Sequence, residues 1–158
     1  MKEAFTHKSL LILGRGIGQV MFQNNALSGL LMLIGIFLNS WQMGLLAVSG
    51  NIISTSTGRI SGYDRDDIKN GLYGFNGTLV GIAVGVFMHL TVNSLILMAI
   101  ASCASTYIAR FFNMQRMLPG FTTLFILSVW MLLGLCSWLM PDMLLVSDTE
   151  TPASSSIN

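Results

Sequence analysis

The sequence has very few charged residues. Only 9% of its 158 residues are Asp, Glu, Lys or Arg, whereas 53% are hydrophobic and the mean hydropathy is +0.68. Soluble domains contain about 25% charged residues, so this chain lacks the charge to cover its surface in water. We therefore expect it to lie in a membrane. The net charge of +1 is far from the basic balance of nucleic-acid-binding domains, so nucleic acid is not an expected partner.

Residue types that perform chemistry are also scarce. The two cysteines, Cys103 and Cys136, lie in apolar stretches, where a packing role is favoured over a disulfide. The two histidines, His7 and His89, lie in separate segments, and no His, Cys and carboxylate residues share the spacing of metal ligands. No nucleophile and base can be paired either. We expect neither an enzyme nor a bound metal or cofactor.

Five apolar stretches approach or reach the roughly 20 residues that cross a hydrocarbon core. These predicted transmembrane helices are Ala26–Leu38, Met43–Thr57, Leu72–Met88, Val92–Ala109 and Phe121–Met140. Before them, residues 12–22 contain Arg15 and three glycines, which favours a re-entrant half-helix over a full span. The predicted fold is an all-α polytopic membrane protein. It has an N-terminal cytoplasmic segment (1–11), a membrane domain (12–140) and a polar tail or linker (141–158).

The basic residues predict the orientation of this arrangement. With a re-entrant segment and five spans, all eight fall on one side: Lys2, Lys8, Arg15, Arg59, Arg65, Lys69, Arg110 and Arg116. The connections on the other side, Asn39–Gln42, His89–Thr91 and the segment after Pro141, contain no Lys or Arg. The positive-inside rule then places the N-terminus in the cytoplasm and the C-terminus outside, in a cell (inner) membrane.

The charges that are present do not lie inside the apolar stretches. Ion-coupled pumps usually need such groups as relays, so the sequence argues against coupled transport. Asp64, Asp66 and Asp67 lie beside Arg65 and Lys69, which predicts a solvated, charge-balanced loop rather than a metal site.

The third stretch has a glycine pattern. Gly77, Gly81 and Gly85 recur every four residues and therefore lie on one helix face, where they permit close approach of a neighbouring backbone. Phe75 and Leu79 are also four residues apart but lie on a different face. Periodicity alone favours packing against lipid or core for these two residues.

Three segments in combination resemble the urea transporter family. They are GRGIGQVMFQNNALSGLLMLIGIF (14–37), GLYGFNGTLVGIAVG (71–85) and LPGFTTLFILSVW (118–130). The resemblance implies a channel-like protomer of two homologous halves inserted with opposite topology. Each half has a re-entrant half-helix and five spans, and protomers form trimers. This chain resembles the first half. It departs from the family at Asn25-Ala26, where Asn-Pro is frequent, and at Leu124, where proline is frequent.

The resemblance also implies which residues line the pore. Family pore positions fall on Gln19, Phe22, Phe75, Leu79 and Thr122, and Phe22 matches one of two aromatic plates. Without the resemblance, packing would be the favoured role of Phe22, and Gln19 could simply cap a helix end.

The function implied is passive transport of urea through a narrow aromatic and hydrogen-bonding slot. A flat slot accepts a planar solute, and fixed oxygens replace the water around urea's N–H groups. The implied partners are urea, the lipid bilayer, and a complementary second half or full-length protomers. Two alternatives stay open: a pore for another small neutral amide or for ammonia, and a non-conducting fragment.

Overall fold

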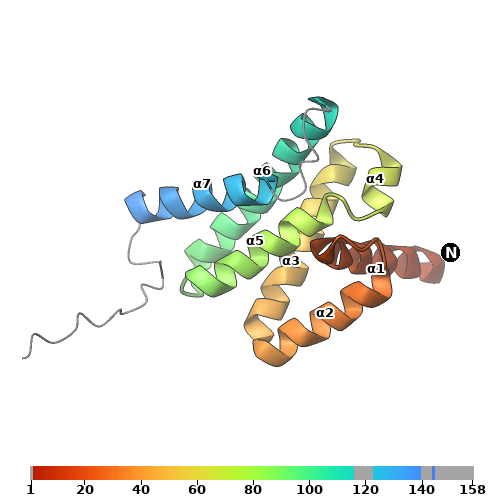
Figure 1. The fold of residues 1–158 in the computed structure, drawn as a ribbon, viewed down its shortest axis with the longest axis horizontal. Coiled ribbons are helices and arrows are strands. Elements are labelled where there is room, and N and C mark those ends of the chain that lie inside the picture. Colours follow the sequence, from red (N-terminus) through yellow and green to blue (C-terminus); the bar gives the residue numbers. More distant parts are fainter. Residues whose placement is uncertain (1, 116–122, 140–143, 145–158) are drawn as a thin grey trace, which may run out of the picture.

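Seven α-helices follow one another along residues 2–115, 123–139 and 144, the part of the chain that this computed structural model describes (Figure 1). The helices are α1 (Lys2–Gly18), α2 (Ala26–Asn39), α3 (Trp41–Ile60), α4 (Arg65–Lys69), α5 (Gly74–Phe87), α6 (Val92–Gln115) and α7 (Thr123–Leu139). A 3-10 turn, η1 (Gln19–Met21), continues α1. Within the described residues no strand forms apart from an isolated bridge between Met88 and Leu144. The predicted all-α class is confirmed.

Helices α2, α3, α5, α6 and α7 occupy the places of the five predicted spans, but their lengths differ. Over Val92–Phe111, α6 is the one described helix that is by itself long and apolar enough to cross a membrane. The 14 residues of α2 and of α5 extend only about 21 Å, short of the roughly 30 Å hydrocarbon core. The pair Lys8–Met21 and Ala26–Asn39 passes the same test together and is bent by 75° at the break.

The N-terminal helix begins earlier than the sequence indicates. The predicted half-helix starts near Ile12, after a separate segment 1–11, whereas α1 runs without a break from Lys2 to Gly18. Residues 2–11 contain neither glycine nor proline, so nothing stops helix propagation there. The bend follows η1 instead, where Asn25 starts α2 by accepting a hydrogen bond from the backbone N–H of Leu27 at 2.9 Å.

The predicted glycine face is confirmed, and it lies against α3. The contact between α3 and α5 is the most extensive between any two described helices. A Cβ atom on Gly77 would collide with the carbonyl oxygen of Gly50, and one on Gly81 would collide with that of Leu46. Backbones in contact cannot move aside as side chains do, so these positions exclude any side chain.

Buried polar side chains join three helices near this contact. Asn51 of α3 is fully buried and donates from Nδ2 to Thr78 Oγ1 of α5 at 2.9 Å and to the Leu13 carbonyl of α1 at 3.3 Å. Thr55 donates to Asn51 Oδ1 at 3.2 Å, and Thr78 donates to the Gly74 carbonyl at 3.0 Å. Because buried polar groups are costly unless they are paired, this network fixes how α1 and α5 lie against α3.

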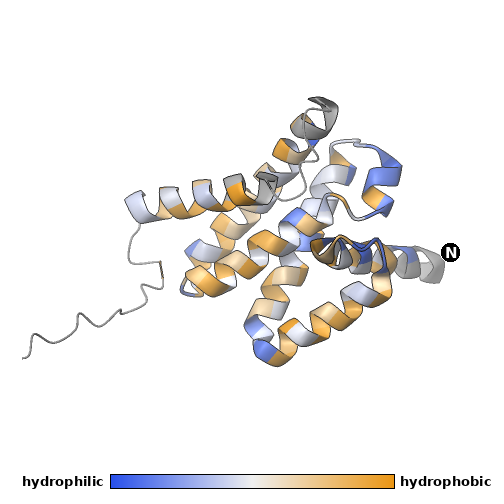
Figure 2. Ribbon diagram, viewed as in Figure 1, coloured by the Kyte–Doolittle hydropathy of each residue, from blue (hydrophilic) through white to orange (hydrophobic). Residues whose placement is uncertain are grey.

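The larger hydrophobic cluster of the described residues lies between α3, α5, α6 and α7. Its buried residues are Leu46, Val80, Val84, Met88, Met98, Ala101, Leu132 and Cys136. Cys136 thus has the predicted packing role, and Cys103 is half-buried, with its sulfur 3.3 Å from Thr57 Oγ1. Neither cysteine forms a disulfide. Figure 2 shows that α2 and α5 are mainly hydrophobic, whereas α4 is mainly hydrophilic.

The connections that the basic pattern assigns to one side lie together at one end of the bundle. Arg15 donates to the Lys69 carbonyl at 3.2 Å, and the Arg110 guanidinium lies 5.2 Å from the centroid of the Tyr63 ring. At the opposite end, Gln42 and His89 line one pocket of about 190 Å³. For the described connections, the predicted grouping therefore agrees with their positions in the fold, whereas Arg116 and most of the segment after Pro141 lie outside the described residues.

Candidate functional site

The bend between α1 and α2 is a helix end with an aromatic residue at its tightest point. The Phe22 N–H donates to the Gln19 carbonyl at 2.9 Å, and the Gln23 N–H donates to the Gly18 carbonyl at 3.1 Å. This pair of bonds is the Schellman pattern, in which the residue that Phe22 replaces is usually glycine because its φ is positive. Phe22 has a φ of 57° and is the one non-glycine residue with positive φ in the described chain.

The backbone of Phe22 is strained, and its ring is not buried. The left-handed conformation costs a non-glycine residue about 1–2 kcal/mol, and such strain concentrates at functional sites. The side chain is nevertheless 69% exposed, so burial of the ring in this chain does not offset the strain. The ring lies at the break between two apolar helices, where the family resemblance implies a functional aromatic residue.

Gln19 lies on the other side of the same turn. Its Nε2 donates to the Asn70 carbonyl at 3.0 Å, and its side chain is half-buried. Asn70 is the C-cap residue of α4, so Gln19 does cap a helix end, but of a helix 51 residues away. The turn that contains Gln19 also contacts α5.

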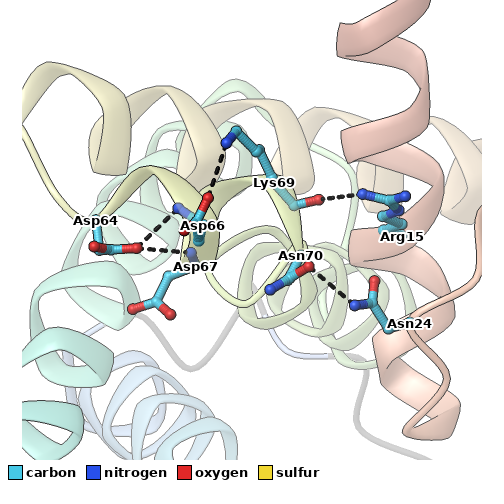
Figure 3. Close-up of polar contacts among 7 residues, drawn as sticks. All are labelled: Arg15, Asn24, Asp64, Asp66, Asp67, Lys69 and Asn70. Atoms are coloured by element: carbon cyan, nitrogen blue, oxygen red, sulfur yellow. Dashed lines mark hydrogen bonds and ion pairs between the residues drawn. The ribbon is translucent and has the colours of Figure 1, made fainter.

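The remaining amides of the turn are hydrogen-bonded as well. Asn24 donates from Nδ2 to Asn70 Oδ1 at 3.0 Å (Figure 3), and Ser28 donates to Gln23 Oε1 at 2.7 Å. With Asn25 as the N-cap of α2, each of the four amides in this stretch has a hydrogen bond. The polar turn is therefore exposed but held by hydrogen bonds of its own side chains.

The acidic segment next to the turn forms a helix, so its prediction as a loop was wrong. Asp64 caps α4 by accepting from the backbone N–H groups of Asp66 at 2.8 Å and Asp67 at 3.2 Å. Hydrogen bonds from those two N–H groups hold the pKa of the Asp64 carboxyl below its ordinary value of 3.8, and the bond from Asp67 has the larger effect. Lys69 pairs with Asp66 at 2.8 Å on the surface. The predicted charge balance is present, and the described residues contain no group of potential metal ligands.

The predicted residues of α5 differ in their surroundings. Phe75 is 5% exposed, so it belongs to the interior of this chain, and Leu79 is half-buried. Thr122 lies outside the described residues. The structure thus brings the turn that contains Gln19 and Phe22 against the helix that contains Phe75 and Leu79.

Asn76 is a residue that the sequence did not single out. It is 1% exposed, and within the described chain neither Oδ1 nor Nδ2 of its amide has a hydrogen-bond partner. Native proteins contain few such groups. It follows Phe75 in α5 and precedes Leu79 by three positions, so Asn76 and Leu79 share part of a helix face. Its neighbour Phe75 was identified by its spacing of four residues from Leu79 and by the family resemblance. A single Asn in an apolar stretch has no such periodic pattern.

A groove of about 500 Å³ separates the two arms of the bent pair above α3. It is lined by Leu10, Leu11, Leu13, Gly14, Ile17, Ala26, Leu27, Leu30, Leu33, Val48 and Asn51. Only Asn51 in this lining is polar, and its Nδ2 is already hydrogen-bonded. The groove therefore suits hydrocarbon rather than a hydrogen-bonding solute.

A family model described as Urea transporter matches residues 10–156 of the chain. The chain belongs to the urea transporter family. The match includes the bent pair, the α4 segment and α5, and confirms the resemblance seen in the sequence.

Curated members of the urea transporter family share part of this sequence. Urea transporter 1 of Mus musculus is 41% identical over 75 residues, which make up 48% of this chain and 20% of the mouse protein. Urea transporter 1 of Rattus norvegicus is 42% identical over 73 residues, or 46% of this chain and 19% of the rat protein. The chain thus matches about a fifth of the length of these relatives.

Proposed function

We propose that this chain forms one side of a passive pathway for urea across a membrane. The observation that best supports the proposal is Phe22, a strained and 69% exposed aromatic residue at the break of a bent apolar helix pair. Membership of the urea transporter family supplies the solute. The printed names of the relatives describe urea transporters.

The chemistry of the turn suits urea. Urea is planar and neutral, with one carbonyl acceptor and two amino donors, so an aromatic face can stack on it while fixed oxygens accept its N–H bonds. Leaving those N–H groups unpaired in a dry passage would cost several kcal/mol. Ions lose far more solvation energy, and the uncharged side chains proposed for the slot, Gln19, Phe22, Phe75, Leu79 and Thr122, would compensate little of it.

The proposed slot needs a second face. Phe22 is exposed on the described chain whereas Phe75 is buried, so the two rings do not enclose a passage between them here. We propose that a complementary half with opposite topology supplies the facing aromatic residue, and that complete protomers assemble as trimers. The basic residues at one end of the bundle, with Arg15 bonded to the Lys69 carbonyl, support a cytoplasmic location for that end.

Stopped-flow urea flux into proteoliposomes tests this function. Three preparations would be compared: vesicles with the chain alone, vesicles with the chain and the complementary half of a full-length family member, and vesicles without protein. We expect urea flux above the protein-free rate only for the two halves together, with acetamide and ammonia slower than urea. Absence of urea flux in both protein preparations would contradict the transport function. If acetamide or ammonia passes faster than urea, that compound rather than urea is the favoured solute of the pathway.

A further inference from the structure

We propose that Asn70 is a positioning residue for the Phe22 turn and sets which half of the Gln19 amide is available to a solute. The inference rests on the proposed function for its consequence in transport, but its structural part stands on the contacts between α4 and the end of α1. Asn70 is hydrogen-bonded to residues on both sides of Phe22, to Gln19 before it and to Asn24 after it.

The cap at the end of α4 leaves two carbonyl groups without a partner in the cap itself. The Leu72 N–H donates to the Asp67 carbonyl and the Gly71 N–H to the Ile68 carbonyl, both at 3.1 Å. These two bonds form a Schellman motif with Gly71, at φ 76°, in the left-handed position. The carbonyls of Lys69 and Asn70 remain outside this pattern, and helix-end carbonyls need partners from elsewhere.

Residues of α1 and η1 provide those partners. Arg15 Nη1 donates to the Lys69 carbonyl at 3.2 Å (Figure 3), and Gln19 Nε2 donates to the Asn70 carbonyl at 3.0 Å. Arg15 and Gln19 are four residues apart and so lie on one face of the helix end. Gly71 brings the loop against this face, since a Cβ atom on Gly71 would collide with the backbone of Gly16.

The bond to Asn70 decides the orientation of the Gln19 amide. A backbone carbonyl can only accept hydrogen bonds, so the atom of Gln19 that faces Asn70 must be the donor Nε2. The amide oxygen Oε1 is then the half of the side chain left to accept from a solute. Urea has four N–H donors and a single carbonyl, so a fixed acceptor suits it better than a freely rotating amide.

The side chain of Asn70 holds the other side of the turn. Its Oδ1 accepts from Asn24 Nδ2 at 3.0 Å (Figure 3). The backbone carbonyl and the side chain of one residue thus fix positions 19 and 24, and Phe22 lies between them. This double attachment restrains a turn whose central residue is in a strained left-handed conformation.

A nitroxide label on Met21→Cys tests the positioning role without any measurement of transport. Met21 suits the label because it is 63% exposed and adjoins Phe22. The background is Cys103→Ala, Cys136→Ala, so that neither native cysteine is labelled. We expect Asn70→Ala to narrow the electron paramagnetic resonance lines of this label, since the turn gains motion. Asn70→Asp keeps the Oδ1 acceptor and should leave the lines unchanged. A label on Leu38→Cys, which is 84% exposed at the far end of α2, should respond to neither substitution.

Several outcomes would overturn the inference. Unchanged lines at Met21→Cys in Asn70→Ala would show that Asn70 does not restrain the turn. Equal narrowing at Leu38→Cys would show general loosening instead of local positioning, and narrowing in Asn70→Asp would show that the acceptor is not what matters.

Urea flux through the two-half assembly tests the consequence. Asn70→Ala keeps the backbone carbonyl that faces Gln19 and removes only the side-chain bond to Asn24. Loss of one hydrogen bond of ordinary strength corresponds to about a fivefold change in rate, so we expect Asn70→Ala to lower urea flux about fivefold through the loosened turn and Asn70→Asp to restore it. Full flux in Asn70→Ala would show that transport does not depend on this restraint of the turn and would overturn that part of the inference. If the unsubstituted assembly conducts no urea, the proposed function fails, while the label experiment still decides the positioning role.

Discussion

At the scale of single residues, Phe22 and Asn76 each have an unfavourable feature. Phe22 has a positive φ at a position where glycine is the usual residue. Asn76 buries both polar atoms of its amide without a partner in the described chain. Neither feature is explained by the packing of the described helices. Both residues belong to the segments that resemble the urea transporter family, and we propose a direct role with the solute for both.

Substitution of Phe22 separates its strain from its function. Phe22→Gly should stabilise the fold by about 1 kcal/mol relative to Phe22→Ala, because only glycine adopts positive φ without cost. Both variants remove the ring, so both should change urea flux or the preference for urea over acetamide. Thermal unfolding in detergent and flux in the two-half assembly provide the two measurements. Phe87→Ala, at an aromatic residue 46% exposed on α5, is the control. Unchanged kinetics in both Phe22 variants would remove Phe22 from the slot.

Substitution of Asn76 by Leu, which is similar in size, should stabilise the fold and impair transport. An unpaired buried amide costs about 1–3 kcal/mol, so Asn76→Leu should raise the unfolding temperature of the described helices. If the amide meets urea, the same variant lowers urea flux in the assembled protein. A lower unfolding temperature would instead show that the Asn76 amide has a stabilising partner, which is a structural role.

At the scale of elements, the sequence predicted the helices better than their ends. Five apolar stretches became five helices, and the spacing of Gly77, Gly81 and Gly85 correctly identified the face that packs against a neighbour. The beginning of α1 was missed because the prediction treated residues 1–11 as a segment separate from the half-helix at 12–22, which was identified by Arg15 and three glycines. The helix in fact starts at Lys2 and continues through those residues to Gly18. The helix α4 was missed because five residues of mixed charge resemble a loop until Asp64 is recognised as their N-cap.

The hydrogen bond between Gln19 and Asn70 could not have been predicted. The two residues are 51 positions apart, and they meet only because Gly71 fits against Gly16 of α1. The sequence therefore predicted Gln19 as a site residue from the family pattern, but not the loop that orients it. Local patterns predict elements, whereas contacts between distant turns depend on the packed fold.

Gly81→Ala should destabilise the contact between α3 and α5 strongly. The new Cβ would collide with the Leu46 carbonyl, and because backbone must shift, we expect a loss of about 1–3 kcal/mol. Gly35→Ala is a matched control, since a Cβ on Gly35 meets nothing within 4 Å and alanine stabilises a helix interior by about 1 kcal/mol. Thermal unfolding followed by circular dichroism compares the two. A Gly81→Ala protein as stable as the unsubstituted chain would contradict the close contact.

The cap of α4 should weaken in acid. The folded-state pKa of Asp64 lies below its ordinary value of 3.8, so the ionised form stabilises the folded chain. That stabilisation is fully present above pH 3.8 and is lost as the pH falls further, through the folded-state pKa. Unfolding temperatures of the chain and of Asp64→Asn, whose cap cannot ionise, should therefore converge below pH 3.8. A difference that stays constant down to pH 2 would contradict this origin of the stabilisation.

At the scale of the whole molecule, the fold brings together connections that the charge pattern assigned to the same side. At one end of the bundle, a hydrogen bond joins Arg15 to the Lys69 carbonyl, and a cation–π contact joins Arg110 to Tyr63. Gln42 and His89 lie together around a pocket at the other end. We propose that such separated ends give the chain one favoured orientation in a membrane, because translocating a cluster of basic residues is disfavoured. An antiparallel pair of identical chains is correspondingly disfavoured, and this supports a distinct second half.

Cysteine labelling in intact cells tests that single orientation. In a Cys103→Ala, Cys136→Ala background, Leu90→Cys, which is 49% exposed in the connection after α5, should react with a membrane-impermeant maleimide added outside. Arg65→Cys, exposed at the start of α4, should react only after the cells are opened, because we propose a cytoplasmic location for the basic end of the bundle. Equal outside labelling of both positions would reveal two populations of opposite orientation. The same chain could then provide both faces of the slot, and the requirement for a different second half would be lost.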